Sequence, residues 1–301
     1  MSSGSNSRLA LPTGTKLDRF EIQSVLGAGG FGITYCAYDP ALKRYLAIKE
    51  LFPSDIALRL DGIRVGAREP AYNEELKWAR ERFITEGRIL AECDHKAVMG
   101  VYDTFDLNGT AYLLMPYLQG RTLSEWKDEI GERPGLSELC VLSRHVLSGL
   151  RAVHRKSFLH RDIKPDNIYL TDDGQPILID FGAARLAISS RSQPITSIVT
   201  PGYAPFEQYY SESETDGTQG PWTDLYSFGA VLWWAIVGKK PLAATRRTQI
   251  DIGLLADTPE LVKVYGAKFL RGVDRALFME QTARPQTADE MYWDLLGKTL
   301  P

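Results

Sequence analysis

The sequence predicts an α+β chain with a strand-rich first third and a mostly helical remainder. Residues 17–50 alternate apolar and polar side chains on both sides of a glycine-rich run, a pattern typical of β-strands. Residues 73–92 repeat apolar side chains at helical spacing. The apolar run at 225–237 is shorter than the roughly 20 residues that span a bilayer, so it predicts a buried helix.

The order of these elements predicts two lobes, as is common for a chain of 301 residues. A linker near residues 115–118 should separate them. The expected elements are three strands within 17–50, a helix at 73–92, strands at 98–106 and 110–114, and a helical pattern from Leu123 onward. The expected parts are a disordered N-terminal tail at 1–14, an N-lobe at 15–115 and a C-lobe at 116–301.

Composition argues against several classes of protein. The formal net charge is −3 and no basic tail is present, so the sequence implies no nucleic-acid partner. The three cysteines are far apart and lack metal-binding spacing, which indicates reduced thiols. The N-terminal residues lack the apolar core of a signal peptide, and no apolar run suits a membrane segment. We therefore expect a cytoplasmic location, and the sequence leaves open delivery into a host cell.

Residues 160–167 read His-Arg-Asp-Ile-Lys-Pro-Asp-Asn and carry the strongest chemical signal. Asp162 is a candidate base, Lys164 a candidate cation and Asn167 a candidate metal ligand. Phosphoryl transfer to a hydroxyl needs these three kinds of group close together. Each residue alone would be typical of a solvated loop. The whole string resembles the catalytic loop of protein kinases, H-R-D-x-K-P-x-N, and a match of this length is specific.

A glycine-rich run lies upstream, between two strand-like stretches. It reads G-x-G-x-x-G and comprises Gly27, Ala28, Gly29, Gly30, Phe31 and Gly32. A dinucleotide-binding domain uses the same pattern, but there a helix begins at the last glycine. Here residues 33–38 continue as a strand rich in β-branched and aromatic side chains. The run therefore resembles the flap that covers ATP phosphates in protein kinases, where glycines let the backbone approach closely.

Residues 46–49 read Leu-Ala-Ile-Lys and resemble the V-A-I-K strand of protein kinases. An unpaired ammonium in an apolar strand is costly, so Lys49 should have a partner. Phe83, Glu86 and Leu90 stand at i, i+3 and i+7, which puts the Glu86 carboxylate on the inward helix face. We therefore expect an ion pair between Lys49 and Glu86. The alternative is a lysine on the solvent face of an edge strand.

Further motifs follow in the order found in protein kinases. The resemblance implies that Asp180 and Asn167 bind Mg²⁺, that Glu207 pairs with Arg284, and that Asp224 binds the backbone of the catalytic loop. These motifs are Asp-Phe-Gly at 180–182, the end of an activation segment at 200–207, the stretch 222–229 and Ala-Arg-Pro at 283–285.

The chain is thus similar to bacterial, eukaryotic-like serine/threonine protein kinases over nearly its whole length. The resemblance implies a two-lobed α+β kinase fold, with a small antiparallel sheet and one key helix in the N-lobe. It implies ATP with Mg²⁺, or alternatively Mn²⁺, and protein serine or threonine hydroxyls as substrates. Asp162 would accept the hydroxyl proton, Lys164 would neutralise charge on the phosphoryl group, and Lys49 would bind the α- and β-phosphates. Lys164 and Thr200 favour serine/threonine over tyrosine specificity.

The resemblance also implies an adenine pocket. Ala47 would form its roof and Met115 its back, while Pro116 and Leu118 of the linker would bond adenine through their backbone. Proline lacks an N–H, but only its carbonyl is needed at that position. Thr34 stands where the family usually has valine, which affects the packing of the roof and no catalytic group.

Two features suggest regulation. Arg161 precedes the catalytic aspartate, and in similar kinases this arginine often binds a phosphorylated residue of the activation segment. We expect autophosphorylation between residues 189 and 197, at Thr196 or Ser197, whereas Thr200 should contact the catalytic loop. Residues 53–72 exceed the usual kinase outline. They are either a plain surface insertion, which costs little, or a regulatory element for a partner beside the Glu86 helix.

Two other classes of protein share this fold. A pseudokinase usually lacks Lys49, Asp162 or Asp180, and all three are present. A small-molecule kinase of the antibiotic or choline type seldom keeps a glutamate and an arginine like Glu207 and Arg284. Turnover of Mg-ATP would distinguish a protein kinase from a pseudokinase. A comparison of protein with metabolite substrates would distinguish it from a small-molecule kinase.

Overall fold

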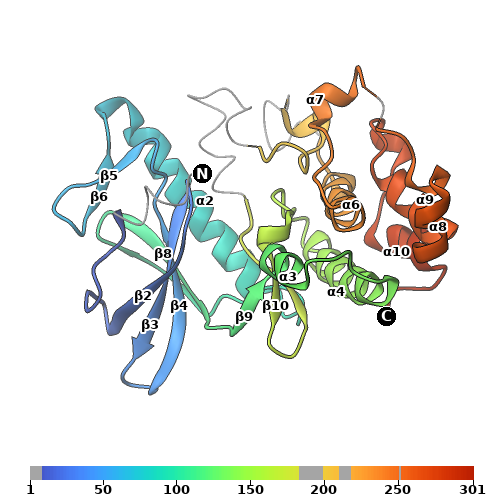
Figure 1. Ribbon diagram of the computed structural model, residues 1–301. Coiled ribbons are helices and arrows are strands. Elements are labelled where there is room, and N and C mark those ends of the chain that lie inside the picture. Colours follow the sequence, from blue (N-terminus) through green and yellow to red (C-terminus); the bar gives the residue numbers. More distant parts are fainter. Residues whose placement is uncertain (1–8, 183–198, 210–217, 251) are drawn as a thin grey trace. The chain divides into compact units, whose positions relative to one another are not determined.

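The computed structural model describes residues 9–182, 199–209, 218–250 and 252–301. The chain forms two compact units (Figure 1). The described part of unit 1 is residues 9–94 and 99–118, and unit 2 contains residues 95–98 and the described residues from 119 onward. Unit 1 is a sheet with one long helix, and unit 2 is mainly helical, so the predicted α+β class is confirmed.

Unit 1 is built on a six-stranded antiparallel sheet with the strand order β1-β2-β3-β4-β8-β7. One boundary differs from the prediction, because β7 begins at Asp103 rather than at residue 98. Val98 instead bridges to Leu178 and belongs to unit 2. The strands are β1 (Lys16–Leu17), β2 (Phe20–Ala28), β3 (Gly32–Asp39), β4 (Arg44–Leu51), β7 (Asp103–Leu107) and β8 (Thr110–Pro116).

The long helix of unit 1 is α2 (Asn73–Ala91), which follows the 3₁₀ turn η2 (Pro70–Tyr72). A Cβ atom on Gly87 would lie 2.5 Å from Cδ2 of Leu113 and 2.6 Å from Cγ2 of Thr104. The absence of a side chain at Gly87 therefore lets α2 approach β7 and β8 closely. This contact fixes the helix turn that carries Glu86 against the sheet.

Residues 53–72 form a small antiparallel hairpin of β5 (Ala57–Arg59) and β6 (Val65–Ala67), drawn in light blue in Figure 1. The Val65 N–H donates to the Asn108 carbonyl over 2.8 Å, which ties β6 to the turn between β7 and β8. The insertion is therefore an ordered part of unit 1 with its own contacts.

Residues 9–14 pack on unit 1, whereas the sequence led us to expect a disordered tail over 1–14. The Leu11 side chain is 3% exposed, and its N–H donates to the Tyr35 hydroxyl over 3.0 Å. The Leu9 carbonyl accepts a hydrogen bond from Nε of Arg59. Burial of one leucine and two backbone bonds compensate the loss of chain entropy here.

Unit 2 combines helices with a three-stranded sheet in the order β11-β10-β9. Leu225, Phe228 and Leu232 on α6 are fully buried in the core of unit 2, as predicted for this apolar run. No described helix is long and apolar enough to cross a membrane. The elements are β9 (Gly120–Thr122), α3 (Leu123–Ile130), α4 (Leu136–His154), β10 (Ile168–Thr171), β11 (Pro176–Leu178), α6 (Pro221–Val237), α7 (Ala244–Arg247), α8 (Pro259–Tyr265), α9 (Ala267–Ala276) and α10 (Ala288–Leu296).

Candidate functional site

The loop at residues 160–167 is anchored by a buried carboxylate at the start of α6. Oδ2 of Asp224 accepts the His160 N–H over 2.9 Å, and Oδ1 accepts the Arg161 N–H over 2.8 Å. Nε2 of His154 lies 2.8 Å from Oδ2. Burial alone would raise the pKa of Asp224, but the hydrogen bond and charge of His154 and the Arg161 N–H lower it. Asp224 is therefore an ionised acceptor that fixes the loop backbone, as expected.

His160 links this loop to the chain before Asp180. Its ring is fully buried and tilted against the Phe181 ring, with the ring centroids 4.2 Å apart. Its Nε2 lies 3.0 Å from the Ile179 carbonyl oxygen. Nδ1 accepts the Asp162 N–H over 3.3 Å, so Nε2 carries the proton. Burial lowers the pKa of His160, which keeps the imidazole neutral.

Three side chains converge on the Asp162 carboxylate. Oδ2 accepts from Nζ of Lys164 and Nδ2 of Asn167, each over 2.9 Å. Oδ1 accepts from the Thr200 hydroxyl, also over 2.9 Å, which is the contact that the sequence predicted. Four of the predicted residues therefore share one small region of unit 2. A carboxylate in a fixed position beside an ammonium suits proton transfer from an incoming hydroxyl.

The hydrogen bonds of Asn167 and the exposure of Asp180 indicate whether these two residues can bind a metal ion. The Asn167 amide nitrogen donates to the carbonyl of Asp162 over 2.7 Å and faces the carbonyl of Asp180 at 3.4 Å. Its amide oxygen therefore points away from these acceptors. Asp180 is exposed and has a positive φ of 57°, a strained conformation typical of functional sites. These two oxygen donors fit Mg²⁺, which usually takes few protein ligands together with phosphate oxygens.

The described ranges contain no group of three or more His, Cys, Asp and Glu side chains that could hold a metal ion. Asn167 and Asp180 would therefore supply only part of the ligands that Mg²⁺ takes.

Arg161 also has a positive φ, 65°, and its carbonyl accepts from Nε2 of Gln208 over 2.9 Å. Gln208 thereby ties the loop to the segment that follows Thr200. The predicted phosphorylation sites Thr196 and Ser197 lie outside the described residues, and so does the rest of the 189–197 stretch.

That segment is anchored by the predicted pair of Glu207 and Arg284. The guanidinium binds both carboxylate oxygens, over 2.7 Å and 3.2 Å, and both side chains are at most 2% exposed. Arg284 also donates to the carbonyls of Phe278 and Met279 and lies over the Tyr226 ring. A buried ion pair whose guanidinium makes four hydrogen bonds fixes the geometry of the chain near Thr200.

The glycine loop, residues 27–32, joins β2 to β3 in unit 1. β3 begins at the last glycine, so the predicted strand continues and the helix of a dinucleotide-binding domain is absent here. A Cβ atom on Gly32 would lie 2.6 Å from the Glu50 carbonyl oxygen. Glycine is therefore required there for the loop to approach β4.

The strand pairing places the remaining predicted residues of unit 1 on one face of the sheet. Ala47 pairs with Met115, and Lys49 pairs with Leu113, so these side chains project on the same side. Gly87 of α2 packs on Leu113, which brings the Glu86 turn to the strand beside Lys49. The Glu86 side chain is buried, at 2% exposed. Pro116 ends β8, and Leu118 follows two residues later at the end of the unit.

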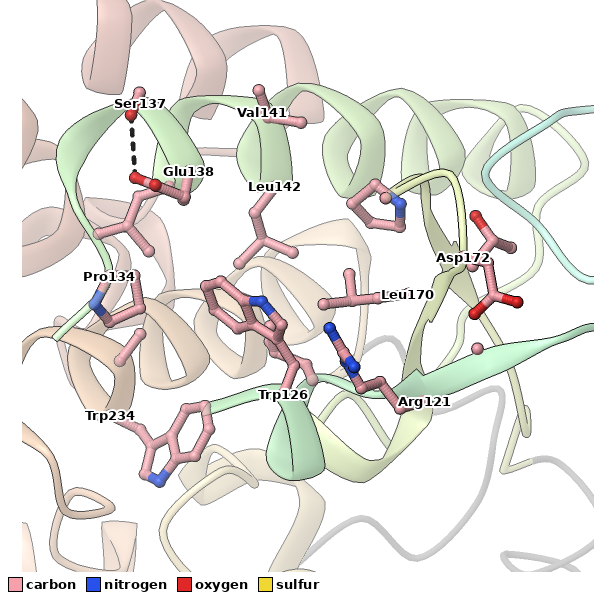
Figure 2. A pocket seen from close by; sticks show the side chains of 17 residues that line it. Arg121, Trp126, Pro134, Ser137, Glu138, Val141, Leu142, Leu170, Asp172 and Trp234 are labelled. Carbon is pink, nitrogen blue, oxygen red and sulfur yellow. Dashed lines mark hydrogen bonds between the residues drawn. The ribbon is translucent and has the colours of Figure 1, made fainter. Parts of the chain in front are cut away.

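A cavity of about 620 Å³ lies in unit 2, lined in part by residues of α3, α4 and β10 (Figure 2). Trp126, Leu142 and Leu170 line its apolar wall, and Arg121 and Asp172 stand at its rim. No predicted site residue lines it. The candidate catalytic residues are therefore located by the sequence motifs and not by this cavity.

Sequence reasoning missed one charged cluster, which is buried under the insertion. Glu50 of β4 is fully buried and forms a bidentate ion pair with Arg59 of β5. The hydroxyls of Tyr35 and Tyr112 also donate to this carboxylate. The signal was present, since Glu50 is a second charge in the apolar stretch after Lys49, and a buried carboxylate requires partners.

Comparison with known proteins supports the motifs. The family described as "Protein kinase domain" matches residues 20–300. The probable serine/threonine-protein kinase SCO3848 of Streptomyces coelicolor is 30% identical over 92% of this chain and 39% of its own length. The probable serine/threonine-protein kinase PknB of Corynebacterium glutamicum is 31% identical over 92% of this chain and 42% of its own length. The chain thus spans about two fifths of these two curated relatives.

Solved structures agree with these findings. The structure described as "PpkA-294 apo form" has a TM-score of 0.84 and 36% identity, and the match covers 95% of this chain and 99% of that one. The kinase domain of Mycobacterium tuberculosis PknI has a TM-score of 0.70 at 19% identity, covering 96% and 100% of the two chains, which shows the fold alone. The predicted two-lobed protein kinase fold is therefore confirmed.

Proposed function

The chain belongs to the protein kinase family, and we propose that it transfers the γ-phosphoryl group of ATP to serine and threonine hydroxyls of proteins. The convergence of Lys164, Asn167 and Thr200 on the Asp162 carboxylate carries this proposal. It supports a site in which Asp162 orients the hydroxyl and accepts its proton, while Lys164 neutralises the phosphoryl oxygens. The chemistry then depends on positioning and electrostatics, with no covalent intermediate.

The remaining roles follow from the same proposal. The glycine loop covers the phosphates, and Lys49, paired with Glu86, binds them. Ala47, Met115 and the linker residues Pro116 and Leu118 surround adenine. Asn167 and Asp180 supply oxygen ligands for Mg²⁺, or for Mn²⁺ in its place, and the metal neutralises phosphate charge. We place this activity in the cytoplasm.

Autophosphorylation of Thr196 or Ser197 would add a dianion that Arg161 can bind. The buried contacts of Glu207 and Gln208 support this part of the proposal, because they fix the chain that follows the proposed phosphorylation sites. Mass spectrometry of the active protein beside a catalytically inactive variant would locate the phosphate. Its absence between residues 189 and 197 in the active protein would remove this role for Arg161.

The test of the proposed function uses purified protein, labelled ATP and two substrate panels. We expect label on serine and threonine of acceptor proteins, and none on amino alcohols or aminoglycosides. Mg-ADP should raise the melting temperature, because a ligand that binds only the folded state stabilises it. Binding without turnover would indicate a pseudokinase, and label on the small molecules alone would indicate a metabolite kinase.

A further inference from the structure

The insertion at residues 53–72 begins as a continuation of the sheet. The last pair of the β3–β4 ladder is Gly32 with Leu51. Beyond it, the Phe52 N–H donates to the Phe31 carbonyl over 3.0 Å, and the Ser54 N–H donates to the Gly30 carbonyl over 2.9 Å. The Ser54 hydroxyl lies 3.3 Å from the same carbonyl. The first residues of the insertion therefore bind the tip of the glycine loop.

These bonds orient the peptides of the glycine loop. A trans peptide points its C=O and N–H in opposite directions. The carbonyls of Gly30 and Phe31 point toward the insertion, so the N–H groups of Phe31 and Gly32 point away from it. Glycine peptides rotate easily when nothing fixes them, and backbone N–H groups are the usual ligands of phosphate. The insertion thus fixes groups that the proposed function assigns to the ATP phosphates.

Arg68, at the far end of the hairpin, fixes the position of Ser54. Its guanidinium donates to the Ser54 carbonyl over 2.8 Å, and its N–H donates to the Ile56 carbonyl over 2.8 Å. The N–H of Ala57 donates to the Pro53 carbonyl over the same distance. Arg68 near the end of the insertion is therefore bonded to Ser54 near its start, and Ser54 is the residue that contacts the glycine loop.

The hairpin itself is anchored on β4, one residue beyond Lys49. Arg59 binds both oxygens of Glu50, over 2.6 Å and 2.5 Å, with side-chain exposures of 7% and 0%. The hydroxyls of Tyr35 and Tyr112 complete the shell of the carboxylate at 2.8 Å and 3.1 Å. Burial beside this carboxylate raises the pKa of both tyrosines, so both remain hydrogen-bond donors. A buried pair with these partners gives the hairpin one fixed position on the sheet.

We propose that residues 53–72 position the glycine loop for ATP, with Ser54 and Arg68 as positioning residues and the ion pair of Arg59 with Glu50 as the anchor. The inference rests on the ATP-dependent activity proposed above. It adds a structural role to the two interpretations that the sequence left open, because the insertion bonds the glycine loop directly.

The test compares two exposed arginines of the same hairpin. Arg68→Ala removes the bond to Ser54, whereas Arg64→Ala removes only an exposed pair with Asp61, 2.7 Å apart at the hairpin tip. We expect Arg68→Ala to weaken ADP binding and raise KM for ATP about three- to tenfold, the effect of one or two hydrogen bonds, with kcat changed less than about twofold. Arg64→Ala should match the wild type. Arg68→Lys, which retains one donor, should recover part of the affinity.

Hydrogen exchange without nucleotide supplies a second readout. The amides of Phe52 and Ser54 should exchange faster in Arg68→Ala than in Arg64→Ala, at an unchanged melting temperature. Equal ADP affinity in the two variants, or equal exchange, would overturn the positioning role while the wild type still binds ADP. A lower kcat with unchanged KM would also overturn it. A wild type that binds no ADP would overturn the proposed function, and the positioning role with it.

Discussion

The catalytic loop of unit 2 and the glycine loop of unit 1 are fixed by different means. Buried charge anchors the first, because Asp224 accepts two backbone N–H groups and His160 bonds the chain before Asp180. The second is anchored by backbone bonds to an insertion near the surface, whose Arg59 forms a buried ion pair with Glu50 of β4. Under the proposed function, the loop that carries the reacting carboxylate is thus held by buried charge. The loop that would admit nucleotide is held by backbone bonds near the surface, which open at lower cost.

The largest effect should come from Asp224→Ala in the rigid loop. The change leaves the N–H groups of His160 and Arg161 buried without their acceptor, and each such group costs about 1–3 kcal/mol. We expect the free energy of unfolding to fall by about 2–6 kcal/mol, the sum for the two N–H groups, and phosphoryl transfer to be lost. Denaturant unfolding checks this value. Asp289→Ala, which removes an exposed pair with Arg151, is the control and should cost less than about 1 kcal/mol.

Arg59→Ala should come next, because it leaves the Glu50 carboxylate buried without its cation. Removal of one partner of a buried pair typically costs about 3–5 kcal/mol. Replacing both partners, as Arg59→Met with Glu50→Gln, should restore much of that stability. Denaturant unfolding of Arg59→Met, Glu50→Gln and the double variant gives the coupling energy between the two side chains. Additive losses would show that the pair does not anchor the hairpin.

Thr200→Val should lower kcat about tenfold, since it removes the hydroxyl that donates to Oδ1 of Asp162. Thr200→Ser keeps the donor and should retain most of the activity. Steady-state kinetics at saturating ATP distinguish the two variants. Equal kcat values would mean that this hydrogen bond does not orient the base.

The smallest effect concerns pH. Burial lowers the pKa of His160 below its ordinary value of 6.5, so the unfolded chain binds a proton that the folded chain rejects. Below about pH 6.5 the unfolded state binds more protons, and stability falls as the pH drops. Between pH 7 and pH 5 we expect the wild type to lose stability relative to a His160→Gln variant. Parallel stability curves for the two proteins would contradict this neutral state of His160.

Three contacts were predicted correctly because each joins a residue to an obligatory partner. The pair of Glu207 with Arg284, the bonds of Asp224 and the contact of Thr200 with Asp162 were all expected from motifs, and all are present. The boundaries of elements and the contacts that anchor irregular segments were harder to predict. Residues 9–14 lack any strand or helix pattern, so their packing against Tyr35 and Arg59 depends on tertiary contacts alone.

The insertion likewise depends on tertiary contacts that the sequence pattern did not predict. Arg59 and Glu50 are nine residues apart in the sequence and are brought together only by the turn that begins after Phe52. Periodicity does not reveal such a pairing, although the isolated charge of Glu50 in an apolar strand signals that a partner must exist. The bond from the Ser54 N–H to the Gly30 carbonyl leaves no sequence signal, because both groups belong to the backbone.

The most direct test of the central claim is the turnover of Asp162→Asn measured beside its affinity for ADP. Asparagine keeps the size of the side chain but does not accept the proton of a substrate hydroxyl. We predict a loss of about 10²–10⁴ in kcat, with ADP affinity and melting temperature close to those of the wild type. Near wild-type turnover by purified Asp162→Asn would contradict the assignment of the catalytic base, and with it the proposed kinase mechanism.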